Sequence, residues 1–321
     1  MNTVEIHNVS KRFGPIQAVD DVTFAVQPGE IFGLLGPNGA GKTTTIRMML
    51  NILRPDTGNI SVFAGPMNEE KKNRIGYLPE ERGLYADNKL LDTVLYLATL
   101  KGMSRQQARP VAEEYLRRLD LWEYRDEKLS ALSRGMQQKA QFIVTIIHDP
   151  DLLIVDEPFS GLDPVNTELI RDILLRQRDA GKTIIMSTHQ MHQVEAMCDR
   201  IVLIDHGRVV LRGPVMEVRR TFAGNTVEVN GRGPIPDLLD DAVKHAHLHN
   251  GSWRLTLADD VTPQQALHVL AANEQVAIEH FSVALPSLHE IFIQVVEDKE
   301  PAAADDSQPT AASGLDTTLT P

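Results

Sequence analysis

The feature that most constrains this chain is a glycine-rich segment that fits the phosphate-binding pattern G-x-x-x-x-G-K-[ST] at every fixed position. The segment reads Gly36-Pro37-Asn38-Gly39-Ala40-Gly41-Lys42-Thr43. It follows the apolar run from Ile31 to Leu35 and precedes a stretch with helical spacing. A strand, a glycine-rich turn and a helix in this order direct backbone N–H groups and the positive end of a helix dipole at one anion. The chain is therefore predicted to contain a buried strand that ends in a nucleotide-binding loop.

The side chains of this loop have distinct expected roles. Lys42 can reach the β- and γ-phosphates of a nucleotide, and the Thr43 hydroxyl is placed to ligate Mg²⁺. We also expect Thr44, the residue after the pattern, to contribute to nucleotide binding. A glycine-rich turn without function is the alternative, and the complete match in a strand-to-helix context favours nucleotide binding.

Composition narrows the class of protein. The chain has 321 residues, of which 42% are hydrophobic and 24% charged, as in ordinary globular proteins, and its length allows two domains. No apolar run approaches the roughly 18 residues that cross a bilayer, and the first residues lack the pattern of a signal peptide, so we expect a cytoplasmic protein. The single Cys198 suits a reducing compartment. The net charge of −12 disfavours nucleic acid as a partner.

The order of predicted elements indicates the fold class. The stretches from Val4 to Val9 and from Val22 to Val26 read as a small antiparallel sheet. Between them, Phe13 is a candidate for stacking on adenine, although a lone aromatic is more often part of a core. Helical spacing runs from Leu90 to about Leu121, with Ser104 and Gln107 forming a capping box. Elsewhere strands and helices alternate, which predicts an α/β domain with a mostly parallel sheet, an antiparallel β subdomain and a helical subdomain.

Two acids follow another apolar strand, which runs from Leu152 to Val155. They are Asp156 and Glu157, at the carboxyl end of a predicted parallel strand, where open α/β sheets place their chemistry. Asp156 offers the oxygen ligands that Mg²⁺ prefers, and Glu157 is then close enough to act as a general base on water. Two acids that only cap a strand end are the alternative.

Several segments in a fixed order give the chain a family resemblance. After the phosphate loop come the signature from Leu132 to Gln138, the acidic strand end, the turn from Ser160 to Asp163, and His189. In this order they make residues Val4 to Arg220 similar to the ATP-binding subunit of an ABC transporter. The segments from Ile75 to Tyr85 and from Leu132 to Lys139 resemble the sodium-efflux and related exporter branch.

The resemblance implies further roles. His189 corresponds to the family's switch histidine, which contacts the γ-phosphate and helps to position the attacking water. Ser133 and Gly135 would close over the nucleotide of a second ATPase subunit, the same chain or a different one, in a head-to-tail dimer with Asp163 at the interface. The expected cofactors are ATP and Mg²⁺. The expected function is the motor of an exporter, bound on the cytoplasmic face of the membrane to a separate integral membrane permease.

The chain departs from the family at Glu80, where most members carry Gln. In the family this side chain approaches Mg²⁺ and the attacking water and senses the permease, so we count Glu80 with both the catalytic and the metal-binding residues. An alternative function is a soluble ABC ATPase that acts on ribosomes or DNA. Such proteins carry two ATPase sets or a long coiled-coil or zinc insertion, and this sequence has neither.

The last third of the chain lacks ATPase motifs. We predict an ATPase domain over residues 1–220, a small α/β accessory domain over residues 221–297, and a disordered tail over residues 298–321. The alternation of His245, His247 and His249 suggests a metal site, since the three share one strand face. A hairpin turn at Asn250-Gly251 would set them opposite polar residues, which favours a solvated polar face instead.

Overall fold

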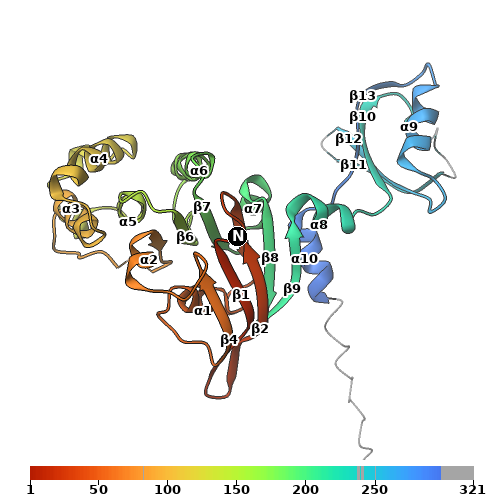
Figure 1. The fold of residues 1–321 in the computed structure, drawn as a ribbon. Helices are drawn as coiled ribbons and strands as arrows, with labels where there is room; N and C mark the ends of the chain where they lie inside the picture. The colour runs from red at the N-terminus through yellow and green to blue at the C-terminus, as the bar shows by residue number, and fades with distance from the viewer. Residues whose placement is uncertain (82, 237–238, 240–241, 250, 298–321) are drawn as a thin grey trace, which may run out of the picture.

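The computed structural model describes residues 1–81, 83–236, 239, 242–249 and 251–297 (Figure 1). The predicted disordered tail therefore lies outside the described residues. Within them the α/β architecture is confirmed, with a parallel sheet, an antiparallel subdomain, a helical subdomain and a separate C-terminal sheet. Every helix of the described part falls short of the length or the hydropathy that a bilayer-spanning segment requires.

The central sheet has six strands in the order β5-β6-β7-β3-β8-β9. They are β5 (Ile75–Leu78), β6 (Leu152–Asp156), β7 (Thr183–Thr188), β3 (Ile31–Leu35), β8 (Arg200–Asp205) and β9 (Arg208–Pro214). Neighbouring strands are parallel except for the β8–β9 hairpin. The strands β3, β6 and β7 are buried along their whole length, as is usual for central parallel strands that are covered on both faces. Because these three are parallel, their carboxyl ends bring the phosphate loop, the two acids and His189 to one edge.

The antiparallel subdomain is a three-stranded sheet in the order β2-β1-β4. Its strands are β1 (Val4–Phe13), β2 (Ile16–Val26) and β4 (Thr57–Val62). Both β1 and β2 run further than predicted and meet at Gly14 and Pro15. Register shifts along β1 interrupt its pairing with β2, so the sequence pattern loses its period of two before the strand ends. This sheet covers α1 (Lys42–Met49), and the two share a hydrophobic core with one face of the central sheet.

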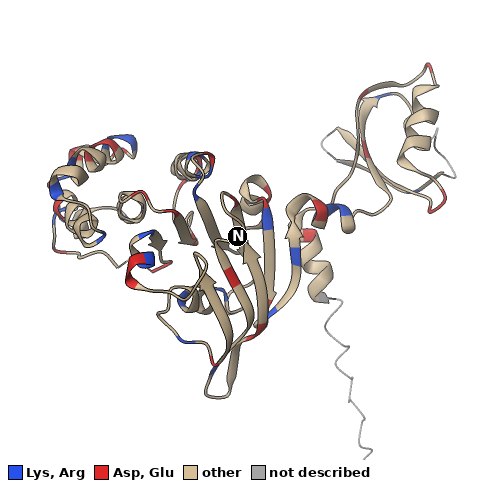
Figure 2. Cartoon of the chain, viewed as in Figure 1, with Lys and Arg blue, Asp and Glu red and all other residues tan. Residues whose placement is uncertain are grey.

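Helices cover the other face and extend to one side. They are α3 (Leu90–Leu100), α4 (Arg105–Arg118), α5 (Arg134–Ile146), α6 (Pro164–Asp179) and α7 (Met191–Met197), with short 3₁₀ turns at Trp122–Tyr124 and Leu129–Ala131. The short helix α2 (Glu69–Asn73) precedes β5 and has no buried residue. The predicted capping box of Ser104 and Gln107 is confirmed at the start of α4. Acidic and basic residues occur together on α4 and on α6 in Figure 2, with an i,i+4 pair between Arg109 and Glu113, so these helices present mixed charge to solvent.

The C-terminal region begins with α8 (Val215–Thr221) and forms a four-stranded sheet in the order β11-β12-β10-β13. Its elements are β10 (Thr226–Arg232), β11 (Val243–His249), β12 (Ser252–Leu257), α9 (Pro263–Ala271), β13 (Ala277–Val283) and α10 (Leu288–Glu297). The sheet and α9 enclose a small core of their own, which includes Val229, Leu255 and Leu270. In contrast, α10 lies beside α8 and away from the sheet in Figure 1, and its Leu288 and Ile291 belong to the main core of the ATPase.

The predicted register of the histidine-bearing strand is confirmed. His245 pairs with Thr256, His247 with Arg254, and His249 with Ser252. Asn250, in the turn that was used to predict this register, lies outside the described residues. Among the residues that are described, no group of three or more His, Cys, Asp or Glu side chains gathers within reach of one ion.

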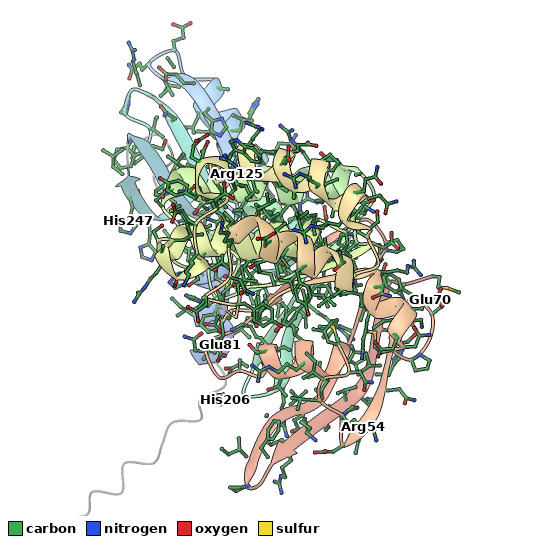
Figure 3. All side chains as sticks on the ribbon, turned by 90° about the vertical axis from the view of Figure 1, so that its left-hand side faces the viewer. Arg54, Glu70, Glu81, Arg125, His206 and His247 are labelled. Carbon is green, nitrogen blue, oxygen red and sulfur yellow. The ribbon has the colours of Figure 1, made fainter. Side chains whose placement is uncertain are left out.

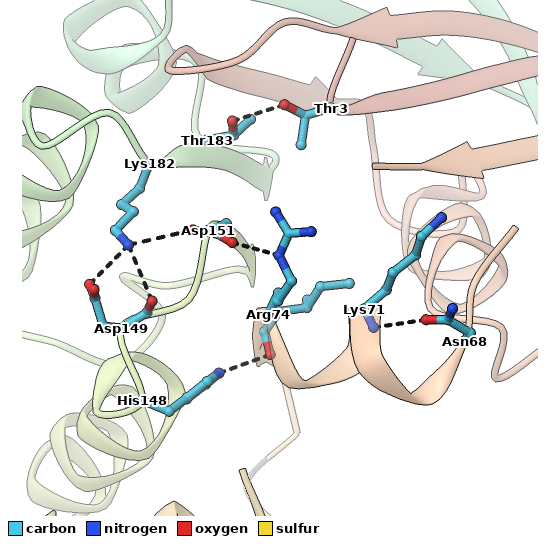
Figure 4. A network of polar contacts seen from close by, with 10 residues as sticks. Thr3, Asn68, Lys71, Arg74, His148, Asp149, Asp151, Lys182 and Thr183 are labelled. Carbon is cyan, nitrogen blue, oxygen red and sulfur yellow. Dashed lines mark hydrogen bonds and ion pairs between the residues drawn. The ribbon is translucent and has the colours of Figure 1, made fainter. Parts of the chain in front are cut away.

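A polar network joins the amino ends of the central strands, on the edge opposite the acids (Figure 4). Lys182 Nζ lies 3.0 Å from Asp149 Oδ1 and 3.7 Å from Asp151 Oδ1. Arg74 Nε donates to Asp151 Oδ2 at 2.7 Å, so the residues that precede β5, β6 and β7 are tied together. The polar contacts at the amino edge therefore stabilise the sheet, whereas the residues with candidate catalytic roles lie at the carboxyl edge.

Candidate active site

The phosphate loop has the predicted context, between β3 and α1, and two of its glycines are required by its geometry. Gly36 has a φ of 148° and Gly41 a φ of 104°, conformations that side chains with a Cβ rarely adopt. A Cβ on Gly36 would collide with the carbonyl oxygen of Ile204, and one on Gly41 with that of Ala18. The loop is therefore pressed against β8 on one side and β2 on the other.

Lys42 is held in place before any phosphate contact. Its side chain is buried, and Nζ donates to the carbonyl oxygens of Gly36 at 2.7 Å and Pro37 at 3.0 Å. Burial lowers the pKa of Lys42, and the nearby carboxylates of Glu157, Asp156 and Glu80 oppose that shift. An ammonium has three N–H donors, so one is left for a phosphate oxygen.

Asp156 and Thr43 form the oxygen-rich part of the site. The Thr43 hydroxyl donates to Asp156 Oδ2 at 3.0 Å, and only 1% of Asp156 is exposed. Burial raises the pKa of Asp156, while the hydrogen bond from Thr43 lowers it. A buried carboxylate beside a hydroxyl is a ligand set that suits a hard divalent cation, so these residues fit Mg²⁺.

Glu157 has a backbone conformation unusual for its residue type, with a φ of 49°. Its N–H donates to the carbonyl oxygen of Ser187 on the neighbouring strand at 2.8 Å. A residue other than glycine in the left-handed backbone region costs on the order of 1 to 3 kcal/mol of folding free energy. Such residues are typical of functional positions. The turn directs the Glu157 side chain back toward β7.

The Glu157 carboxylate is held by the end of β7. Oε2 accepts a hydrogen bond from the Thr188 hydroxyl at 2.9 Å, and Oε1 accepts one from the His189 backbone N–H at 3.0 Å. His189 Nδ1 lies 2.7 Å from the same Oε1. Because an ionised carboxylate only accepts, Nδ1 carries the proton in this pair. The structure thus brings together Glu157 and His189 and adds Thr188, which was not among the predicted site residues.

These groups border a cavity of about 320 Å³. It is lined by Ala18, Asn38, Gly39, Gly41, Lys42, Thr43, Thr44, Glu80, Asp156 and Glu157. Glu80 reaches it from the loop after β5, which α5 supports, since Gln141 Nε2 donates to the carbonyl oxygens of Pro79 at 3.4 Å and Glu81 at 3.2 Å. Glu81 is labelled in Figure 3, in which the helical subdomain faces the viewer.

Phe13 is not among the residues that line the cavity. It ends β1, pairs with Ile16, and is 45% exposed, with Lys11 Nζ 5.6 Å from its ring centroid. Ala18, two residues beyond Ile16 on β2, does line the cavity. A small alanine carries no chemical signal in a sequence, so the β2 wall of the site was not predicted.

The residues expected to act on a second nucleotide lie at helix starts, outside this cavity. Ser133 caps α5 and accepts from the Met136 N–H, and Asp163 caps α6 and accepts from the Asn166 N–H at 2.9 Å. The bonds from Asn166 lower the pKa of Asp163. A Cβ on Gly135 would have its nearest neighbour outside its own helix, a Leu162 methyl group, at 3.8 Å, so packing does not require glycine there.

A phosphate loop, two acids and a histidine at one edge of a parallel sheet define a P-loop nucleoside triphosphatase. Residues 19–160 match the family model described as "ABC transporter", and residues 213–296 match "ATP-binding protein DrrA1-3-like, C-terminal domain". The chain belongs to the ATP-binding subunits of ABC transporters, and it is an ATPase of that family.

Relatives and solved structures agree with this family. The "Uncharacterized ABC transporter ATP-binding protein YhaQ" of Bacillus subtilis is 40% identical over 305 residues, which cover 91% of this chain and 97% of the relative. "Nod factor export ATP-binding protein I" of Burkholderia lata is 34% identical, over 82% of this chain and 88% of its own. A solved structure titled "Structure of ATP binding subunit of ABC transporter" has a TM-score of 0.64 and 31% identity, over 68% of this chain and 93% of that one.

Proposed function

We propose that this protein is the motor subunit of an ABC exporter and hydrolyses Mg²⁺-ATP while bound to a separate permease. The observation that carries the proposal is the Glu157 carboxylate, fixed by Thr188 and His189 at the border of the cavity that Lys42 and Thr43 line. The export direction follows relatives that are named for export. The narrower resemblance to the sodium-efflux branch rests on two sequence segments and is part of the proposal.

The proposed chemistry assigns one task to each group. Mg²⁺, when bound, would neutralise phosphate charge, and Thr43 and Asp156 would hold it, with Glu80 as an auxiliary ligand. Lys42 binds the phosphates, and Glu157 accepts the proton of the attacking water. Three hydrogen bonds orient Glu157, two of them on Oε1 and one on Oε2, and a lone pair of Oε2 is left for water.

We propose that the working unit is a head-to-tail dimer with two nucleotides at the interface. Ser133 and Gly135 lie at the start of α5, and the N-terminus of a helix suits an anion supplied by another subunit. Asp163 lies at the start of α6 and would face the same interface. ATP would then join the two subunits, and hydrolysis would release them.

The proposed permease contact is a groove of about 400 Å³ between the end of α1 and the end of α3. It is lined by Leu50, Asn51, Ile52, Lys72, Ile75, Tyr77 and Lys101. Large apolar side chains are exposed on this part of the molecule, namely Ile52 in the groove, Leu100 at the end of α3, and the edge-on pair of Tyr85 and Tyr96. A partner with an apolar helix fits such a surface.

The contact is tested by purifying the tagged full chain from membranes of cells that make its permease. We expect an integral membrane protein to co-purify and Ile52→Glu to release it, because a charge would be buried in the groove. Val269→Glu, a matched change at an exposed position on α9, should retain the companion. A membrane preparation in which the natural chain has no integral membrane companion contradicts the proposal.

Glu80 offers a second test, because it replaces the family's usual Gln. Glu80→Gln keeps an oxygen ligand and removes one negative charge, so hydrolysis should stay within about tenfold of the natural protein. Phosphate release at saturating Mg²⁺-ATP measures this, with Glu157→Gln in parallel. If Glu80→Gln proves the slower of the two, Glu80 is the base and Glu157 belongs to the metal shell.

A further inference from the structure

The last helix of the described residues, α10, packs against α7, the helix that follows the proposed switch histidine. On α10, Leu288 and Ile291 are buried in the main core, and Phe292 and Val295 pack against the same core. Their spacing of i, i+3, i+4 and i+7 places the four on one helical face. Residues of α10 and α7 contact each other directly, so α7 packs against a segment that is distant from it in sequence.

Polar contacts fix the start of α10 between α7 and α8. The Glu195 carboxylate, on α7, accepts a hydrogen bond from the backbone N–H of Leu288, the first residue of α10, and lies 3.6 Å from Arg219 on α8. Arg219 Nε in turn donates to the carbonyl oxygen of Pro286 at 2.9 Å, and Arg219 Nη2 donates to the carbonyl oxygen of Leu285 at 3.3 Å. A carboxylate at a helix N-terminus is also favoured by the helix dipole. Glu195 therefore links three helices at one point.

This junction is close in sequence to the site. His189 precedes α7 by a single residue, Gln190, and α7 is one short helix, from Met191 to Met197. Val194, on the inner face of α7, is completely buried, so this face of the helix is fixed against the central sheet. On the side of α7 that carries Glu195, α10 holds the helix, and the hydrogen bond between His189 Nδ1 and Glu157 forms just before the start of the same helix.

We propose that Glu195 is a positioning residue for hydrolysis, and that α10 acts through it to hold α7 and thereby the contact between His189 and Glu157. This rests on the role proposed above for His189. The C-terminal sheet, which is attached through α10, would then influence turnover without touching the nucleotide.

The test is steady-state ATP hydrolysis by the full-length Glu195→Ala protein. We expect kcat to fall about three- to tenfold, within the range of coupling through packed elements, and KM for ATP to stay within about twofold, because the phosphate loop is untouched. Glu195→Gln, which can still accept from the Leu288 N–H, should recover part of the lost kcat. Lys244→Ala breaks an exposed ion pair with Asp259 in the C-terminal sheet and should behave as the natural protein.

A double variant separates positioning from simple destabilisation. If Glu195 acts through His189, Glu195→Ala should cost nothing further in a His189→Ala background. Additive losses, or a normal kcat per folded molecule after correction for thermal unfolding, would overturn the inference while leaving the proposed function intact. Natural turnover by His189→Ala alone would remove the role of His189 and this inference with it.

Discussion

The Glu157→Gln variant is expected to bind ATP as the natural protein does and to hydrolyse it about 10²- to 10⁴-fold more slowly, as when a general base is lost. The side-chain amide of Gln can take the position that the Glu157 carboxylate occupies. Its oxygen can accept from the His189 backbone N–H, and its NH₂ group can donate to the Thr188 hydroxyl, which both gives and accepts hydrogen bonds. The substitution therefore removes the basic oxygen and keeps the fold of the site.

Two measurements check this expectation. Phosphate release gives the rate of hydrolysis, and a binding titration with ATP gives the affinity. Because ATP would bind without being consumed, the variant should accumulate as an ATP-bound dimer in size-exclusion chromatography. Turnover at the natural rate would exclude Glu157 from the mechanism.

Lys42→Ala is expected to fail at the earlier step of nucleotide binding. The substitution deletes the ammonium and leaves Asp156, Glu157 and Glu80 as uncompensated negative charge around the phosphates. The loss of a charge-assisted hydrogen bond should weaken ATP binding by about ten- to hundredfold, and charge repulsion adds to this. Isothermal titration with Mg²⁺-ATP measures the change.

The matched control is Lys182→Ala, which removes another lysine that is paired with carboxylates but lies on the opposite edge of the sheet. Its ATP affinity should equal that of the natural protein. An unchanged affinity for Lys42→Ala would show that the loop backbone alone holds the phosphates.

Predictions from the sequence were most accurate for elements whose position is determined by a single local rule. The parallel direction of β3, β6 and β7 followed from the alternation of strands and helices, and it placed Asp156, Glu157 and His189 at one edge. The register of β11 followed from its turn. The full length of β1 was missed because its irregular pairing breaks the period of two. The contact of Thr188 with Glu157 was missed because a threonine at a strand end is not distinctive until the neighbouring strand is known.

The position of α10 could not be predicted for a different reason. Its apolar stripe indicates a helix with one buried face, and the pattern is the same whichever core the face covers. The choice depends on pairs that are distant in sequence, such as Glu195 with the Leu288 N–H. The same difficulty applies to the contacts expected between subunits. The expected partner of Ser133, Gly135 and Asp163 belongs to another chain, so this sequence alone cannot show the pairing.

The return of α10 to the ATPase makes the C-terminal sheet an insertion in structural terms, with both of its ends anchored on the same body. A chain cut after α8 would lose the sheet and would also uncover the apolar surface that Leu288 and Ile291 occupy. A shorter deletion that joins α8 directly to Ser287 would remove the sheet and keep that surface covered. The two deletions therefore measure different quantities, the first the integrity of the ATPase and the second the contribution of the sheet alone.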